Sequence, residues 1–549
     1  MIHYKFSCSN PSSQFLEIEL SLDCKANEHI FLQLPAWRAG RYQLANYAQN
    51  IRRFRIKDAQ EENVLFEKAS KDRWEFQTTE SGKVTVCYEY WAGKMDAGSA
   101  WADEEQIYVN LINCCFEVSG RSEEEIEVFL DLPKFPEQVS TLLPIGASRW
   151  KARDFQLLAD STILAAKSIT HWKYQIESTL FHIWIHGEVH FDQQLILNRF
   201  KSFSRKLIAD FGEFPELEYH FIFQLLPYAH YHGVEHRRGT IITFGPAESL
   251  IDPNQMEELL GISCHELYHG WNVCRIRPQE LLPYDFSKET YTRTGLILEG
   301  ITTYMGDLYL LKSDVYDLPT YLKHLEKIIA RESSNFGWKN YNILESSYDL
   351  WLDGYVPGIP DRKVSIYTRG ALLALGIDIL LIKNGSSLSE VMKLLWEKFG
   401  KPFIGYHWED FESLIFGSFS DPTEIQRYFS DFVYGYQDLF PQLKSLLGEI
   451  GLELNEKNGE DRLLHNWGIR TNKEGQITQI HPDSKAYSSL MRNDRILGYS
   501  EHDTPSLNLK IDRLGRELQI EIPFETGKFF PEFKLEIAEK TALRETWGK

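Results

Sequence analysis

The chain has 549 residues, more than the roughly 250 to 300 at which a single hydrophobic core stops growing, so several domains are expected. Lys and Arg number 59 against 79 Asp and Glu, a formal charge of −20, which excludes a typical nucleic-acid-binding protein with its excess of basic residues. The hydrophobic fraction, 43%, is that of a globular chain and excludes general disorder.

Three further features bear on the cellular location. Seven cysteines without a CxxC pair predict reduced thiols rather than a disulfide framework. The opening MIHYKFSCSNPSS lacks a basic segment followed by an apolar one, so no signal peptide is predicted. The most apolar stretch, 371–382, is too short for a membrane span, which needs about 20 residues, and it contains Asp378. We therefore expect a cytoplasmic protein with no membrane and no nucleic-acid partner.

Up to about residue 188, short segments alternate apolar with polar residues and are separated by Pro, Gly and Asn. This period of two is typical of strands with one buried face, as in FLEIELSL, KVTVCYEYW and EIEVFLDL. The pattern predicts an all-β domain over 1–188.

The period then changes to that of helices. An amphipathic helix is predicted over 192–210, and a second begins at Pro253, behind the N-cap residue Asp252, and extends to about Val273. Strands lie between the two helices, and helical patterns dominate the segment 295–449.

The remaining boundaries follow from this change of pattern. The middle of the chain predicts an α+β, mostly helical domain over 189–452. Short strands return after that point and predict a small β-rich domain over 453–549. The fold class expected is therefore multidomain.

The string HELYH carries the strongest chemical signal. His265 and His269 are four residues apart, so on a helix both imidazoles lie on one face and can bind one metal ion. Glu266 lies next to them, placed to polarise a water bound to that metal. The alternative interpretation is a solvated helix face without a metal.

A catalytic zinc takes three protein ligands and leaves one position open, so a third ligand is expected. Glu299 is the candidate, because it lies in the predicted helix GLILEGITTY among apolar residues, where burying an unpaired carboxylate is costly. The alternative is a glutamate on the helix surface.

The strings HELYHGWNVCRIRPQEL and YTRTGLILEGITTYMGDL resemble the glycyl aminopeptidase family. These are gluzincin metallopeptidases, similar to the aminopeptidase N group, that often carry a PDZ domain. The N-terminal segment LPAWRAGRYQLANYAQNIRRF is similar to the family's Pro-x-Trp-x-Pro-Gly-x-Tyr region, but it departs from the pattern at Ala39, where the family usually has proline, and at Arg38 and Arg41. The resemblance implies a thermolysin-like catalytic domain.

The resemblance also implies roles for individual residues. It makes His265, His269 and Glu299 the ligands of one zinc ion per chain, and Glu266 the general base. It gives the segment GVEH a role in substrate binding, in which Glu235 holds the free α-amine of the substrate; a solvent-paired glutamate in a turn is the alternative. Gly233 and His236 belong to the same motif, although His236 is equally interpreted as a structural histidine.

Tyr367, in IYTRGALLAL, resembles the aminopeptidase tyrosine that donates a hydrogen bond to the oxyanion of the tetrahedral intermediate. The alternative is a tyrosine at the start of a buried helix, with its hydroxyl bonded to the backbone.

The segments Trp467-Gly468-Ile469 and QIHPDSKAYSSLMRNDRILGYS resemble a PDZ domain, which captures an extended peptide along a strand edge. The sequence departs from the common pattern at Met491 and Asn493. A peptide or protein ligand at this PDZ-like domain and a simple packing role are therefore both left open.

Together these features predict a zinc-dependent aminopeptidase. It would act on peptides with a free N-terminus and release small N-terminal residues such as Gly or Ala, through a zinc-bound water activated by Glu266. One alternative is a non-catalytic scaffold that binds peptides through its PDZ-like domain, and another is a zinc hydrolase acting on non-peptide substrates.

Overall fold

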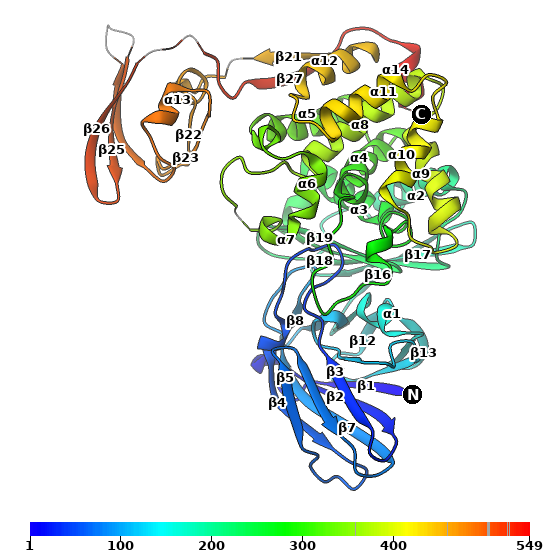
Figure 1. The fold of residues 1–549 in the computed structure, drawn as a ribbon. Helices are drawn as coiled ribbons and strands as arrows, with labels where there is room; N and C mark the ends of the chain where they lie inside the picture. The colour runs from blue at the N-terminus through cyan, green and yellow to red at the C-terminus, as the bar shows by residue number, and fades with distance from the viewer. Residues whose placement is uncertain (357, 458, 502–505, 524, 526, 549) are drawn as a thin grey trace.

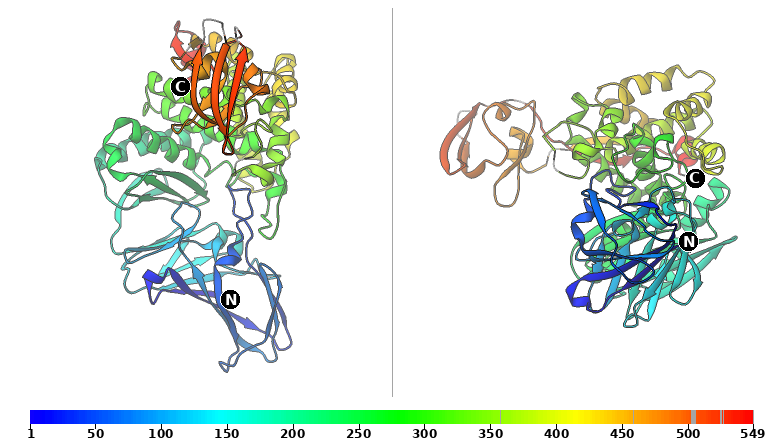
Figure 2. Two further views of the ribbon diagram at one scale, coloured as in Figure 1. Left: turned by 90° about the vertical axis from the view of Figure 1, so that its left-hand side faces the viewer. Right: turned by 60° about the horizontal axis from the view of Figure 1, so that its bottom comes forward.

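The computed structural model describes residues 1–549 except 357, 458, 502–505, 524, 526 and 549. The chain is multidomain. A β-rich N-terminal part lies at one end, a helical part follows, and a small β-rich unit projects from the side of the helical part (Figure 1). The two views in Figure 2 show the same separation of the small unit from the rest.

The N-terminal part is built from three sheets whose strands bury alternate side chains. In β2, for example, Leu16, Ile18 and Leu20 are buried, whereas the residues between them are partly exposed. The strand orders are β13-β14-β11-β1-β2-β7-β4, β10-β3-β6-β5 and β12-β15-β9-β8. The strands are β1 (Ile2–Ser7), β2 (Phe15–Cys24), β3 (His29–Gln33), β4 (Ile51–Lys57), β5 (Phe66–Ser70), β6 (Arg73–Gln77), β7 (Gly82–Trp91), β8 (Ala100–Ala102), β9 (Gln106–Asn110), β10 (Glu117–Val118), β11 (Ile126–Asp131), β12 (Glu137–Ser140), β13 (Leu143–Gly146), β14 (Arg149–Ala152) and β15 (Thr162–Ala166), with the short helix α1 (Phe155–Ala159) between the last two.

A mixed sheet with the order β16-β17-β18-β20-β19 lies between the N-terminal part and the helices (Figure 1). Its strands are β16 (Thr170–Ile176), β17 (Thr179–His186), β18 (Glu218–Leu225), β19 (His230–His236) and β20 (Gly239–Gly245). The strands β16 and β17 were expected in the N-terminal domain 1–188. They belong to this sheet instead, because β17 pairs in parallel with β18 across the helix α2 (Gln193–Phe211).

The helical part begins with α3 (Pro253–Tyr268). Asp252 caps its first turn by accepting a hydrogen bond from the backbone N–H of Asn254, and Pro253 occupies the first helical position, where a missing N–H costs nothing. The helix ends at Tyr268, before the expected Val273, and the chain continues in turns. A π-helical turn, Leu296–Ile301, leads directly into α4 (Thr302–Lys312).

Among the following helices, α8 (Thr368–Lys383) is the buried one, because its residues from Arg369 to Ile382 are all buried. The apolar stretch 371–382 thus lies in the interior of the helical part. The helices are α5 (Leu318–Ser333), α6 (Ile343–Tyr348), α7 (Leu350–Asp353), α8 (Thr368–Lys383), α9 (Leu388–Leu395), α10 (Trp408–Gly417), α11 (Thr423–Tyr428) and α12 (Phe440–Glu449). Among the described residues no single helix has the length and apolarity to cross a membrane; a pair over 368–400, bent by 102°, passes on length and composition alone.

The predicted last domain, 453–549, divides in the structure. A unit that we call the C-terminal unit, residues 461–523, packs around its own core of residues that include Trp467, Leu507 and Leu509. Its elements are α13 (Arg462–Trp467), β22 (Ile469–Thr471), β23 (Ile477–Ile480), β24 (Arg495–Glu501), β25 (Ser506–Arg513) and β26 (Arg516–Pro523).

The segments on either side of the C-terminal unit return to the helical part. The strands β21 (Leu452–Lys457) and β27 (Glu532–Ile537) pair with each other, and the final helix, α14 (Ala542–Trp547), packs beside α8. Trp547 is fully buried there and donates a hydrogen bond to the Tyr304 hydroxyl. The C-terminal unit is thus inserted between two segments of one packed body.

Candidate metal centre and active site

The end of α3 presents the two predicted histidines to one point. His265 and His269 lie one turn apart, and their Nε2 atoms are 3.1 Å from each other. The Nδ1 atom of His269 lies 2.7 Å from the backbone oxygen of Asn272 and donates to it. This hydrogen bond leaves the lone pair of His269 Nε2 directed at the shared point, as in metal-binding histidines.

Glu299 reaches the same point from the π-helical turn Leu296–Ile301. Its Oε2 atom lies 3.7 Å from Nε2 of His265 and 3.5 Å from Nε2 of His269. The side chain is buried, and among the described residues this oxygen has no hydrogen-bond partner. Two imidazoles and an orphaned carboxylate oxygen within such distances fit a divalent cation, and the nitrogen and oxygen donors suit zinc.

Asn272 joins the two elements that carry these ligands. Its side-chain amide donates to the backbone oxygen of Ile297, at 2.7 Å, and to the hydroxyl oxygen of Thr302, at 3.0 Å. Asn272 is fully buried. The sequence analysis did not single it out, although it stands within the WNVCRIRP string and its polar side chain among apolar neighbours was the available signal.

Glu266 lies beside the histidines, against strand β19. It is buried, and one carboxylate oxygen has no hydrogen-bond partner among the described residues. Burial raises the pKa of Glu266 to about 8; His269 opposes this shift, and the carboxylates of Glu235 and Glu299 add to it. The side chain also belongs to a second candidate set of metal-binding groups, Glu235, Glu266 and His269.

Gly233 explains how the carboxylate of Glu266 approaches the sheet so closely. A Cβ atom at position 233 would overlap the carboxylate of Glu266, so only glycine leaves the room. The structure therefore gives Gly233 a packing role beneath Glu266.

Glu235 lies two residues further along β19 and faces the same side as Gly233, because side chains alternate along a strand. It is buried, and its Oε1 atom has no hydrogen-bond partner among the described residues. A loop of the N-terminal part covers it: Gly40, with φ of 71°, leaves no room for a Cβ beside this carboxylate.

His236 was interpreted either as a substrate-binding residue or as a structural histidine. Its Nδ1 atom lies 3.4 Å from Asp160, and the side chain is absent from the lining of the pocket that holds Glu266, which favours the structural role. The reason is the strand period, which turns residue 236 away from the face that carries Gly233 and Glu235.

Tyr367 immediately precedes α8 and lines the same pocket as Glu299. Its hydroxyl lies close enough to Glu299 to oppose the rise that burial causes in the pKa of that carboxyl. Burial, with Glu299 and Tyr355 adding to it, raises the pKa of Tyr367 well above its ordinary value. The hydroxyl therefore stays protonated and able to donate.

These side chains line one pocket of about 530 Å³, which we call the catalytic pocket. Helices α3, α5 and α8 form part of its wall, and the loop 38–41 of the N-terminal part contributes Arg38, Gly40 and Arg41. The pocket thus brings together Gly233, Glu235, His265, Glu266, His269, Glu299 and Tyr367.

Two family models match the chain. Residues 3–167 match the peptidase M61 N-terminal domain, and residues 258–373 match M61 glycyl aminopeptidase. No curated protein matches.

Among solved structures, the chain is similar to an aminopeptidase N family protein from Idiomarina loihiensis, with 22% identity, full coverage of both chains and a TM-score of 0.89. It is also similar to an M1 zinc metallopeptidase from Deinococcus radiodurans, with 12% identity, coverage of 80% of this chain and 94% of that one, and a TM-score of 0.49. The Idiomarina structure shares the fold over the whole length.

Proposed function

Because the chain belongs to the M61 glycyl aminopeptidase family and is a peptidase, we propose that it is a zinc-dependent aminopeptidase releasing small N-terminal residues. The preference for Gly or Ala is supported by the family resemblance. The observation that carries the proposal is the convergence of His265, His269 and Glu299 on one buried point, with Glu266 and Glu235 beside it.

His265, His269 and Glu299 would hold one zinc ion per chain. The chemistry that zinc supplies in such a site is Lewis-acid polarisation of the scissile carbonyl and acidification of the attacking water. Asn272 keeps His269 oriented through its backbone oxygen and ties α3 to the turn that carries Glu299.

Glu266 would act as the proton carrier. Its carboxylate takes a proton from the attacking water and later delivers it to the leaving nitrogen of the substrate. The raised pKa of Glu266 supports the second step, because a carboxylic acid with a pKa near neutrality releases and regains its proton readily.

Two further residues would position the substrate. The carboxylate of Glu235 pairs with the α-ammonium group, so a chain interior without that charge is a poor substrate. The hydroxyl of Tyr367 donates a hydrogen bond to the oxygen that becomes negatively charged. The burial of Glu235 beside Glu266 supports this division of roles.

The test combines metal analysis with hydrolysis of glycyl- and alanyl-arylamides, each beside its N-acetylated form. We expect one zinc per chain and turnover of the free-amine substrates alone. In Glu266→Gln, turnover should fall by about a thousandfold or more with the zinc retained. Glu248→Gln, an exposed glutamate outside the catalytic pocket, is the matched control.

Other outcomes of this experiment would favour one of the alternative functions. Zinc without turnover of any arylamide would favour a hydrolase acting on non-peptide substrates, and equal turnover of acetylated substrates would remove the role of Glu235. A chain without zinc would favour the non-catalytic scaffold.

The proposed ligand of the PDZ-like C-terminal unit is a separate matter. A cavity of about 970 Å³ between this unit and the helical part, lined by residues that include Arg470, Thr478 and Asp361, is compatible with a bound peptide segment. Titration of the full chain with a library of short peptides, in the presence of a metal chelator, tests this without interference from catalysis. Saturable binding that Thr478→Ala weakens supports the ligand; its absence leaves a packing role.

A further inference from the structure

Arg38 and Arg41 are the two cations that the N-terminal part contributes to the catalytic pocket. They stand on either side of Gly40, the residue that covers the carboxylate of Glu235. Arg38 is only 7% exposed, and Arg41 is half-buried.

Neither guanidinium group forms an ion pair with a carboxylate in the part of the chain that the structure describes. Arg38 donates to the backbone oxygen of Ala39 at 2.9 Å, and Arg41 donates to the amide oxygen of Gln43 and lies over the ring of Tyr355. A buried cation with only neutral partners is costly unless an anion joins it.

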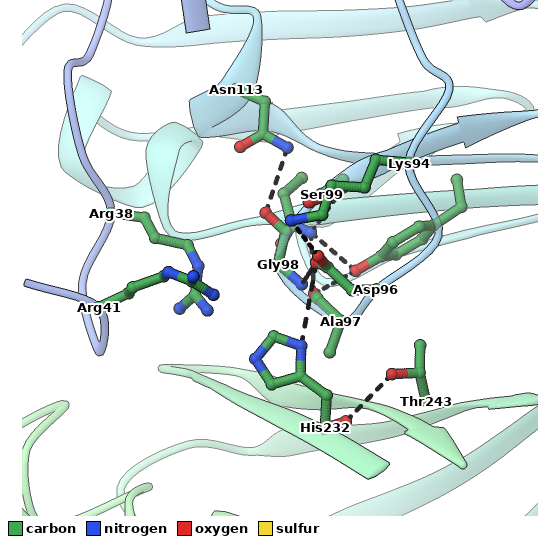
Figure 3. A network of polar contacts seen from close by, with 12 residues as sticks. Arg38, Arg41, Lys94, Asp96, Ala97, Gly98, Ser99, Asn113, His232 and Thr243 are labelled. Atoms are coloured by element: carbon green, nitrogen blue, oxygen red, sulfur yellow. Dashed lines mark hydrogen bonds and ion pairs between the residues drawn. The ribbon is translucent and has the colours of Figure 1, made fainter. Parts of the chain in front are cut away.

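Asp96, the carboxylate in the network of Figure 3, already has other partners. Asp96 pairs with Lys94 at 2.6 Å, accepts a hydrogen bond from the backbone N–H of Gly98 and lies 3.9 Å from His232. The side chains of Arg38 and Arg41 extend from their loop toward this segment (Figure 3). Arg38 packs on Gly98 so closely that a Cβ at this position would overlap the guanidinium group.

The two arginines also line a second cavity, of about 360 Å³, on the side of the N-terminal part. Its other lining groups include Lys94 with its partner Asp96, and Asn50. Arg38 and Arg41 therefore stand where the catalytic pocket and this second cavity meet. The space beside them is sufficient for a side chain that carries a carboxylate.

We propose that Arg38 and Arg41 form a carboxylate-binding subsite for the side chain of the N-terminal residue, so that the enzyme accepts Glu and Asp there besides small residues. The inference rests on the proposed aminopeptidase function, in which Glu235 holds the α-amine. Gly40, between the two arginines, covers Glu235, and both arginines line the same pocket as Glu235, so they stand on the side of the pocket that would take the amine end of the substrate and its first side chain. A bidentate arginine contact is specific for a carboxylate and rejects the uncharged amide.

Two other roles would leave the same contacts. The arginines could act as general counter-charges for Glu235, Glu266 and Glu299, or they could bind the C-terminal carboxylate of a short peptide. The first role affects all substrates equally. The second requires a substrate with a free C-terminal carboxylate, which an arylamide lacks.

The experiment compares kcat/KM for Glu-, Gln- and Ala-arylamides. In the wild type we expect Glu to exceed Gln by about tenfold or more, and in Arg38→Gln and Arg41→Gln we expect this ratio to fall to about one or below. Arg38→Lys should keep part of the ratio, because the charge remains without the planar fork. Arg331→Gln, which removes a cation from the α5 side of the same pocket, should leave the ratio unchanged.

A Glu/Gln ratio of one in the wild type, or an equal loss on all three substrates in Arg38→Gln, would overturn the proposal. So would an effect confined to Ala-Ala against Ala-Ala-amide, which would assign the arginines to the C-terminal carboxylate.

If even Ala-arylamide is not hydrolysed, the proposed function fails, and calorimetric titration of Glu266→Gln with free glutamate and glutamine still decides. Glutamate should bind about tenfold more tightly, and this difference should vanish when Arg38→Gln is added. Equal affinities would reject the subsite.

Discussion

Buried carboxylates occur both in the catalytic pocket and in the C-terminal unit, but they differ in whether their oxygens have hydrogen-bond partners. In the C-terminal unit Asp494 is 2% exposed, accepts hydrogen bonds from Arg513 at 2.7 and 2.8 Å, and accepts another from the backbone N–H of Met491. In the pocket Glu266 and Glu299 are also buried, yet each keeps an oxygen without a partner among the described residues. Asp494, whose oxygens accept hydrogen bonds, stabilises the fold of the C-terminal unit. The partnerless oxygens of Glu266 and Glu299 are instead available to a bound cation or substrate.

The largest effect is expected from a substitution in the candidate metal site of the catalytic pocket. His269→Ala removes one of the converging nitrogens, so we expect zinc content to fall to near zero and kcat/KM to fall by about a thousandfold or more. Metal analysis and arylamide hydrolysis measure the two quantities. His190→Ala, outside the pocket, is the control. Retained zinc in His269→Ala would contradict both candidate metal sets, because His269 belongs to each of them.

Asp494→Asn tests the hydrogen-bonded carboxylate of the C-terminal unit. Loss of the charge weakens the two hydrogen bonds that the buried Asp494 accepts from the partly exposed Arg513, so the C-terminal unit should lose about 2 kcal/mol of stability. Hydrogen exchange localised to 461–523 measures this loss, and arylamide turnover should stay within about twofold. Glu517→Gln, which breaks the exposed pair with Lys510, should cost at most about 0.5 kcal/mol. Equal destabilisation by both variants would contradict the contrast.

Asn272→Ala addresses the group that supports the metal ligands. It removes the bonds to Ile297 and Thr302, and with them the tie between α3 and the turn that carries Glu299, so zinc affinity should weaken by about 10- to 100-fold. Competition with a chromogenic chelator measures it. Asn198→Ala, on the exposed face of α2, is the control. Unchanged affinity together with lower stability would limit Asn272 to packing.

The smallest effect concerns a histidine outside the pocket. Burial, with His182 and Arg238 adding to it, lowers the pKa of His220 well below its ordinary value. Below about pH 6.5 the imidazole of His220 is therefore protonated in the unfolded chain but not in the folded chain. The free energy of unfolding falls by about 1.4 kcal/mol per pH unit from this group as the pH drops.

His220→Asn should lower the slope by this amount while keeping an acceptor for Trp184. A smaller slope remains in the variant, because the pKa values of His171, His182 and His232 are also lowered, to about 4. Chemical denaturation between pH 7 and pH 5 compares the two chains, and an equal slope in both would contradict the contribution of His220.

Local periodicity predicted much of the candidate site. The i, i+4 spacing put His265 and His269 on one face, and the apolar surroundings of Glu299 indicated a buried acid. The orientation of His236 was also accessible, because strand alternation places it opposite Glu235. The sequence analysis weighed its motif instead of its strand period.

Other features depend on contacts that no local pattern encodes. The membership of β17 in the middle sheet follows from pairing with β18, which a helix separates from it in the chain. The π-helical turn at Glu299 and the approach of Gly40 to Glu235 likewise arise from packing between distant segments. The zinc ligation, the amine contact of Glu235 and the PDZ resemblance stay predictions.

The return of the chain after the C-terminal unit has a practical consequence for protein engineering. A stop codon placed after residue 460 would strip β27 from its partner strand and remove Trp547 from beneath Tyr304, exposing apolar surface on the peptidase body. Excision of 461–523 with a short Gly-Ser bridge would instead leave both anchoring segments in place. Because the chain connects the C-terminal unit to the helical part at both of its ends, the unit can reorient less than a domain attached by a single linker.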